Sequence, residues 1–179
     1  MIIDQTLNQP EIQTARLTLR PLRESDAGLW SLYVGERQVA RNTTSIPHPL
    51  PPGAAESYIK QAHAPARTED VWAMDGSAAG LPELVGILSL DRMDRQQSEV
   101  GYWVAPAFWN SGLASEAVEG IVAANPHAAR TLFATVFQDN PASARVLTHA
   151  GFDYIGDAEA FSVARNAKVT TWTYLRKLD

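Results

Sequence analysis

The sequence contains no cysteine. This absence excludes disulfide bonds, zinc sites built on thiolates and a cysteine nucleophile. Histidine is sparse as well, since only His48, His63, His127 and His149 occur along 179 residues. None of their spacings fits a pair of metal ligands, so we expect four unrelated surface or packing histidines and no metal site.

Long apolar runs are also missing. No stretch approaches the roughly 20 apolar residues that a membrane-spanning helix needs. The first residues lack the positive start and the apolar core of a signal peptide. We therefore expect a cytoplasmic protein without a membrane partner.

Basic residues are fewer than acidic ones: the sequence has 15 Lys and Arg and 20 Asp and Glu, which gives a net charge of −5. This balance argues against a general nucleic-acid binder and suits an amine-bearing substrate better than an acidic one. The hydrophobic content of 45% and the charged content of 20% are ordinary for a globular chain of one domain. We expect a flexible lead-in over residues 1–12 and a single domain over residues 13–179.

The hydrophobic pattern predicts an α/β (α+β) chain. Strands are predicted at residues 15–22, 71–74, 84–90, 99–104, 131–136, 152–155 and 170–175. Helices are predicted from about residue 25, at 54–64, at 114–124, and from residue 141 to the glycine at 151. This order of elements predicts a mixed sheet with helices packed on it.

The most informative segment runs from Val100 to Val122, where a strand, a short loop and a helix follow directly on one another. A helix start has unpaired backbone N–H groups and the positive end of the helix dipole. Phosphate groups bind there, and Gly112 removes the side chain that would block their approach. An ordinary strand–helix turn has the same pattern, so the spacing alone leaves both interpretations open.

The residues themselves favour phosphate binding. The run G-Y-W-V-A-P-A-F-W-N-S-G-L-A-S-E-A at 101–117 resembles the acetyl-CoA-binding motif of the GNAT superfamily of N-acetyltransferases, in its RimJ/RimL-type branch. That motif is usually written (Gln/Arg)-x-x-Gly-x-(Gly/Ala), and Gly112 and Ala114 fill its small positions. The block D-N-P-A-S-A-R-V-L-T-H-A-G-F at 139–152 and the opening R-L-T-L-R-P-L-R-E-S-D-A at 16–27 resemble the same branch.

The resemblance implies a mixed, mostly antiparallel sheet that is splayed into a V and flanked by helices on both faces, with acetyl-CoA in the gap. The strand with Tyr102, Trp103 and Val104 would bind the pantetheine arm through its backbone, and Asn140 would bind it from the other side. The pyrophosphate would lie on the loop residues Trp109, Asn110, Ser111, Gly112, Leu113, Ala114 and Ser115.

Two loop residues depart from the family pattern. Trp109 replaces the Gln or Arg at the head of the loop, and Ser111 stands where many relatives have a basic or amide side chain. We therefore expect the phosphates to be held mainly by backbone N–H groups, with less help from a side-chain charge.

The resemblance also implies two catalytic candidates. Ser143 lies on the helix that faces the sulfur in this branch, where its hydroxyl would bond the departing thiolate; the alternative is a serine that bonds its own helix. Leu147 occupies the place of a tyrosine acid found in other relatives. Glu99 is the candidate general base, with burial raising its pKa, and the alternative is a surface carboxylate at a strand edge.

Two functions follow from these residues. The first is an acetyl-CoA-dependent N-acetyltransferase, in which the primary amine of a peptide N-terminus or a small molecule attacks directly in a ternary complex. The second is a non-catalytic acyl-CoA-binding or sensor module of the same fold. The sequence leaves a monomer and a homodimer open.

Overall fold

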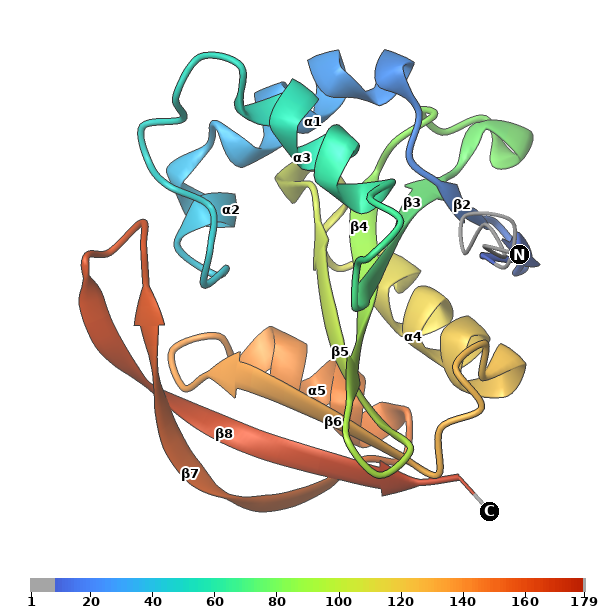
Figure 1. Cartoon of the computed structure of the whole chain (residues 1–179), viewed down its shortest axis with the longest axis vertical. Helices are drawn as coiled ribbons and strands as arrows, with labels where there is room; N and C mark the ends of the chain where they lie inside the picture. The colour runs from blue at the N-terminus through green and yellow to red at the C-terminus, as the bar shows by residue number, and fades with distance from the viewer. Residues whose placement is uncertain (1–8, 179) are drawn as a thin grey trace.

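The computed structural model describes residues 9–178, which form one eight-stranded sheet in the order β1-β2-β3-β4-β5-β6-β8-β7 (Figure 1). Neighbouring strands are antiparallel except for β5 and β6, which are parallel. The predicted mixed, mostly antiparallel sheet is therefore confirmed. The strands are β1 (Ile12–Gln13), β2 (Thr18–Pro21), β3 (Glu69–Asp75), β4 (Gly86–Met93), β5 (Gln97–Val104), β6 (Thr131–Phe137), β7 (Asp153–Ser162) and β8 (Ala167–Lys177).

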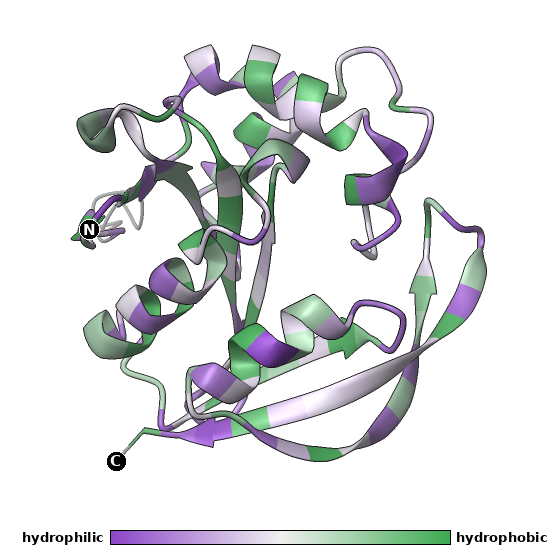
Figure 2. Cartoon of the chain, turned by 180° about the vertical axis from the view of Figure 1, so that it is seen from behind, coloured by the Kyte–Doolittle hydropathy of each residue, from purple (hydrophilic) through white to green (hydrophobic). Residues whose placement is uncertain are grey.

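Helices cover both faces of the sheet, as Figures 1 and 2 show from opposite sides. They are α1 (Ala27–Val34), α2 (Arg37–Ala40), α3 (Ala54–Ala62), α4 (Leu113–Ala124) and α5 (Pro141–His149). Successive side chains of a strand point to opposite faces. Accordingly, Ile87 belongs to a core shared with α1 and α3, whereas its neighbour Leu88 belongs to a second core shared with α4 and α5.

The sheet divides between β5 and β6. β5 pairs with β4 along its whole length, but it pairs with β6 only from Gln97 opposite Thr131 to Glu99 opposite Phe133. Beyond Glu99 the two strands separate, and within residues 9–178 no other strand pairs with this edge of β5. This separation gives the V-shaped opening that the family resemblance implies.

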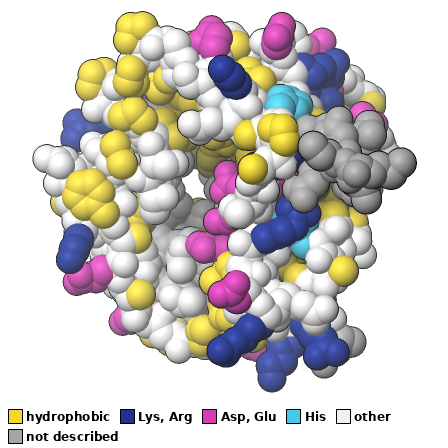
Figure 3. Space-filling view, in the orientation of Figure 1, with side chains coloured by type: hydrophobic (Ala, Val, Ile, Leu, Met, Phe, Trp, Pro, Cys, Tyr) yellow, Lys and Arg dark blue, Asp and Glu magenta, His cyan; other side chains and the backbone are white. Residues whose placement is uncertain are grey.

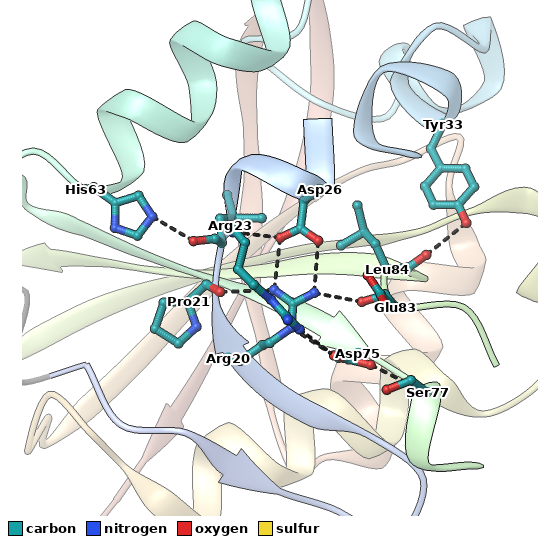
Figure 4. Close-up of polar contacts among 11 residues, drawn as sticks. Arg20, Pro21, Arg23, Asp26, Tyr33, His63, Asp75, Ser77, Glu83 and Leu84 are labelled. Atoms are coloured by element: carbon teal, nitrogen blue, oxygen red, sulfur yellow. Dashed lines mark hydrogen bonds and ion pairs between the residues drawn. The ribbon is translucent and has the colours of Figure 1, made fainter. Parts of the chain in front are cut away.

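A buried ion cluster fixes the arm of the V that contains β2 and β3 (Figure 4). Arg20 is only 5% exposed, and its guanidinium donates to both carboxylate oxygens of Asp26 at 2.9 Å and to Asp75 at 2.8 Å. Asp26 also accepts the backbone N–H of Arg23 at 2.8 Å. A buried charge is tolerated when it is paired and hydrogen-bonded in this way, so the cluster ties the start of α1 to the sheet.

A second buried network fastens the closed end of the V. The imidazole of His127, 2% exposed, lies 2.8 Å from the hydroxyl of Ser98 and 2.7 Å from the carboxylate of Asp70. Arg67 and Arg92 also contact Asp70, at 2.9 and 3.1 Å. Because Ser98 is 1% exposed, substrate has no access to its hydroxyl. This Ser–His–Asp arrangement therefore joins β3, β5 and the segment after α4 and does not act as a nucleophile.

The tip of the β7–β8 hairpin reaches across to the other arm. The N–H of Val163 donates to the carbonyl of Thr44 at 3.0 Å, and Arg165 Nε donates to the carbonyl of Arg41 at 2.9 Å. Arg165 also forms an ion pair with Asp139, in which its Nη2 donates to the carboxylate at 2.9 Å. The chain thereby encircles the gap, and Figure 3 shows an opening through the middle of the molecule.

Several elements differ from the sequence-based expectations. α2 was not expected, and β7 and β8 extend well beyond the predicted strands 152–155 and 170–175. Residues 1–8 of the expected lead-in lie outside the described residues, whereas Ile12 already belongs to β1.

Candidate active site

A cleft of about 850 Å³ lies beside the open part of β5, where α4 begins and α5 passes. All the residues expected to bind the cofactor line this one cleft. They are Tyr102, Trp103, Val104, Trp109, Asn110, Ser111, Gly112, Leu113, Ala114, Ser115, Asn140 and Ser143. The structure thus brings together three segments that are separate in the sequence.

The loop before α4 has an unusual backbone. Asn110 and Gly112 both have positive φ angles, of 58° and 80°. Gly112 is also the N-cap residue of α4, and no side chain caps this helix. A left-handed backbone next to a helix start makes a concave row of N–H groups, which binds anions.

The N–H groups of this row are without an acceptor among the described residues. The first helical hydrogen bond of α4 runs from Glu116 N–H to the carbonyl of Gly112, at 3.0 Å. Within residues 9–178, no backbone or side-chain acceptor contacts the N–H groups of residues 110–115. An anion at a helix start accepts hydrogen bonds from such donors, so these groups fit a phosphate-bearing ligand.

An arginine that the sequence did not indicate lies against the same loop. Arg16, from the turn before β2, donates to the carbonyl of Ser111 at 3.0 Å and to the carboxylate of Glu116 at 2.9 Å. The sequence places Arg16 on the polar side of a strand, far from the loop, and gives no signal of this contact. Arg16 therefore supports the loop through Ser111 and Glu116 without lining the cleft itself.

The open edge of β5 offers backbone groups to the cleft. Ala105 N–H donates to Val85 on the β4 side, at 2.8 Å. Backbone groups alternate between the two sides of a strand, so those of Tyr102 and Val104 point to the open side. The carbonyl of Val104 accepts a 2.6 Å hydrogen bond from the indole of Trp109. The N–H and carbonyl of Tyr102 and the N–H of Val104 remain for a ligand.

Ser143 lies where the cleft meets α5. Its hydroxyl oxygen accepts a hydrogen bond from the Asn140 side chain at 3.2 Å, and its backbone carbonyl accepts one from the Tyr102 hydroxyl at 2.7 Å. Burial raises the pKa of Tyr102, which keeps this phenol protonated. Leu147, one turn further along α5, is fully buried in the core and has no acidic group, so this position supplies no acid to the cleft.

Glu99 does not line this cleft. Its side chain accepts a hydrogen bond from the hydroxyl of Thr135 of β6 at 3.3 Å. Glu99 is the last residue of β5 that pairs with β6 before the two strands separate. Asp91 of β4 pairs with Glu99, and Glu69 of β3 pairs with Asp91, so three acidic residues lie side by side across the sheet. Figure 3 shows acidic side chains beside the central opening.

A second, smaller cavity of about 60 Å³ adjoins the cleft between β5 and β6, and we call it the passage. The passage and the cleft share Asn42, Tyr102, Asn140 and Ser143. Thr135, which contacts Glu99, lies in the wall of the passage. Ser143 therefore borders both cavities, and Glu99 lies beside the smaller one through its contact with Thr135.

Neither a metal site nor a membrane span was found in the part of the chain that the structure describes. Over residues 9–178, no three His, Asp or Glu residues are grouped so as to hold a metal ion. In the same range, no helix is long and apolar enough to cross a membrane.

Comparisons with known proteins agree with this geometry. Residues 16–153 match the family model described as "Acetyltransferase (GNAT) domain". The chain is 27% identical over 156 residues to the uncharacterized N-acetyltransferase YoaA of Bacillus subtilis (strain 168), covering 82% of this chain and 85% of YoaA.

Solved structures share the fold at low sequence identity. The microcin C7 self-immunity acetyltransferase MccE, in complex with acetyl-CoA and AMP, has a TM-score of 0.78 at 13% identity, over 91% of this chain and 93% of MccE. RimL, a ribosomal L7/L12 α-N-protein acetyltransferase in complex with coenzyme A, has a TM-score of 0.76 at 19% identity, over 95% of this chain and 99% of RimL. With a family model that matches most of its length, the chain belongs to the GNAT acetyltransferase family and is an N-acetyltransferase.

Proposed function

We propose that the protein transfers an acetyl group from acetyl-CoA to a primary amine by direct attack in a ternary complex. One observation carries this proposal above the others: the unpaired N–H groups of residues 110–115 line the same cleft as the open edge of β5. The first feature suits a pyrophosphate, and the second suits the amide groups of a pantetheine arm. The acetyl thioester then lies near Ser143.

Ser143 is suited to assist the departing thiolate. When the amine nitrogen attacks the acetyl carbon, the C–N bond forms, the C–S bond breaks, and negative charge develops on sulfur. The Ser143 hydroxyl oxygen already accepts from Asn140, so its hydrogen is directed elsewhere and can donate to that sulfur. A hydrogen bond to a developing charge lowers the barrier by stabilising the transition state.

In this proposal the acceptor amine approaches from the passage side of the gap. Glu99 lies beside the passage through its contact with Thr135, and it accepts the proton that the amine loses, directly or through water. The carboxylates of Asp91 and Glu69 in the same row favour the approach of a cationic amine. A peptide N-terminus and a small amine both meet these requirements.

Two measurements test the proposal. Calorimetric titration with acetyl-CoA tests the cleft, and a saturating concentration should also raise the melting temperature, since a ligand that binds only the folded state stabilises it. Release of free thiol from acetyl-CoA, measured against a panel of peptide N-termini and small amines, tests the transfer. Absence of acetyl-CoA binding would refute the proposal.

The second candidate function is a non-catalytic acyl-CoA-binding module. Two observations favour it. Leu147 is buried where other members of the family have a tyrosine acid, and Glu99 lies outside the cleft. Tight binding of acetyl-CoA without amine-dependent thiol release across the panel would select this function over the transferase.

A further inference from the structure

The first turn of α4 contains a carboxylate with the same charge sign as a phosphate. Glu116 is 16% exposed at its side chain. Burial alone raises the pKa of Glu116, but hydrogen bonds from the Thr14 hydroxyl at 2.5 Å and from Arg16 outweigh it and lower this pKa. Glu116 is therefore ionised, next to the N–H groups that we assign to an anionic ligand, and its charge opposes that ligand unless it is cancelled.

Arg16 cancels this charge and contacts the loop at the same time. Its Nε donates to one oxygen of Glu116 at 2.9 Å, and its backbone N–H donates to the other at 2.8 Å. Its Nη1 donates to the carbonyl of Ser111 at 3.0 Å. Its Nη2 lies 3.4 Å from the position that a Cβ would occupy at Gly112. The planar guanidinium thus spans the back of the loop, from Ser111 to the first turn of α4.

The contact with Ser111 sets the direction of a ligand-binding group. In a planar trans peptide, the carbonyl of one residue and the N–H of the next point in opposite directions. Because Arg16 holds the Ser111 carbonyl on its own side, the N–H of Gly112 points away from Arg16. Gly112 lines the cleft, so this N–H is presented to a ligand.

We propose that Arg16 is a positioning residue for the pyrophosphate loop: it neutralises Glu116 and orients the Ser111–Gly112 peptide so that the loop accepts an anion. This inference rests on the proposed function and makes it more specific. Arg16 then governs binding of the pyrophosphate-bearing part of the thioester and has no part in acetyl transfer itself.

The test compares four variants by calorimetric titration with coenzyme A. R16Q should weaken binding about tenfold or more, the change expected when an interaction of about 1.4 kcal/mol is lost. E116Q should bind as tightly as the wild type or more tightly, and R16Q/E116Q should recover part of the affinity lost in R16Q. The matched control is R23Q, which makes the same charge change at an arginine 52% exposed and paired with Asp75; its affinity should stay within about twofold.

A truncated substrate separates positioning from a general structural role. S-acetyl-pantetheine contains the thioester but no pyrophosphate, so R16Q should use it with the wild-type kcat/KM while its KM for acetyl-CoA rises. Should R16Q be too unstable to measure, R16K replaces it, because a lysine keeps the charge beside Glu116 but cannot span to Ser111. Weaker coenzyme A binding with unchanged S-acetyl-pantetheine turnover then supports the proposal.

Three results would overturn the inference: wild-type affinity of R16Q or R16K for coenzyme A, an equal loss in R23Q, or an equal loss with both substrates. If the wild-type protein itself bound no coenzyme A, the proposed function would fail and the inference with it. Wild-type binding that is insensitive to Arg16 rejects the inference alone.

Discussion

The Tyr102 hydroxyl donates a 2.7 Å hydrogen bond to the backbone carbonyl of Ser143, so a side chain of β5 holds α5 across the gap where the sheet divides. Both residues line the cleft and the passage. The bond therefore fixes the distance between the strand proposed to hold the pantetheine arm and the hydroxyl proposed to assist the thiolate.

Tyr102→Phe removes this bond and keeps the ring. A net hydrogen bond contributes about 1 kcal/mol, so we expect the melting temperature to fall by about 2–4 °C. We also expect faster amide exchange in the first turn of α5. Tyr154→Phe is the control, because this tyrosine is exposed and its hydroxyl bonds the nearby Asp157. Equal melting curves for Tyr102→Phe and the wild type would contradict the role of the bond.

Ser143→Ala tests the thiolate assignment. Hydrogen bonds to charged groups contribute about 1.5–3 kcal/mol, so kcat should fall about 10- to 100-fold, while the Kd for coenzyme A stays within about twofold. Ser57→Ala on the exposed side of α3 serves as the control and should leave kcat unchanged. A wild-type turnover rate for Ser143→Ala would remove Ser143 from the mechanism.

Gly112→Ala tests the loop backbone. A side chain at φ 80° costs about 1–2 kcal/mol and would shift the loop backbone, so coenzyme A binding should weaken about tenfold. Gly28→Ala in α1 is the control, since nothing lies within 4 Å of the added methyl group. It should raise the melting temperature by a few degrees at most, because alanine favours a helix by up to about 1 kcal/mol. Unchanged affinity in Gly112→Ala would argue against the loop as the anion site.

The Asp70 network predicts the pH dependence of stability. Burial raises the pKa of Asp70, but the His127 hydrogen bond and the guanidinium groups of Arg92 and Arg67 outweigh it and hold this pKa below its ordinary value. A lowered carboxyl pKa adds stability that is present above the unfolded-state pKa of about 3.9 and is lost as the pH falls through the folded-state pKa.

We therefore expect Asp70→Asn to lower the free energy of unfolding by about 3 kcal/mol or more at pH 7. Chemical denaturation between pH 7 and pH 3 should show the wild-type and variant curves converging below about pH 4. Asp94→Asn, in the exposed β4–β5 turn, should match the wild type throughout. A gap between wild type and Asp70→Asn that does not change with pH would contradict the assignment.

The elements around the site could be predicted from the sequence because they follow local rules. Gly112 before α4 and Pro141 at the start of α5 mark helix starts by their own backbone preferences. β7 gave only a short signal, because nearly all of its residues lie outside the core and no apolar alternation marks its length. α2 is a single turn without a side-chain cap.

Contacts between residues that are distant in the sequence could not be predicted from it. Arg16 reaches Glu116, and His127 reaches Asp70, only after distant strands have assembled. Each of these residues reads as an ordinary polar position in its own segment. Periodicity and capping rules describe neighbours within a segment, so they do not detect such partners.

The link between the β7–β8 hairpin and residues 41–44 restricts how an acceptor can arrive. With Val163 bonded to Thr44 and Arg165 to Arg41, the tip of the hairpin borders the gap on the side of residues 41–44. An acceptor that uses the proposed passage would therefore enter along the gap and not past the hairpin tip. Since an extended chain advances about 3.3–3.6 Å per residue, we expect a protein acceptor to need a few terminal residues free of its own folded body, and an amine in the middle of a rigid surface to stay out of reach.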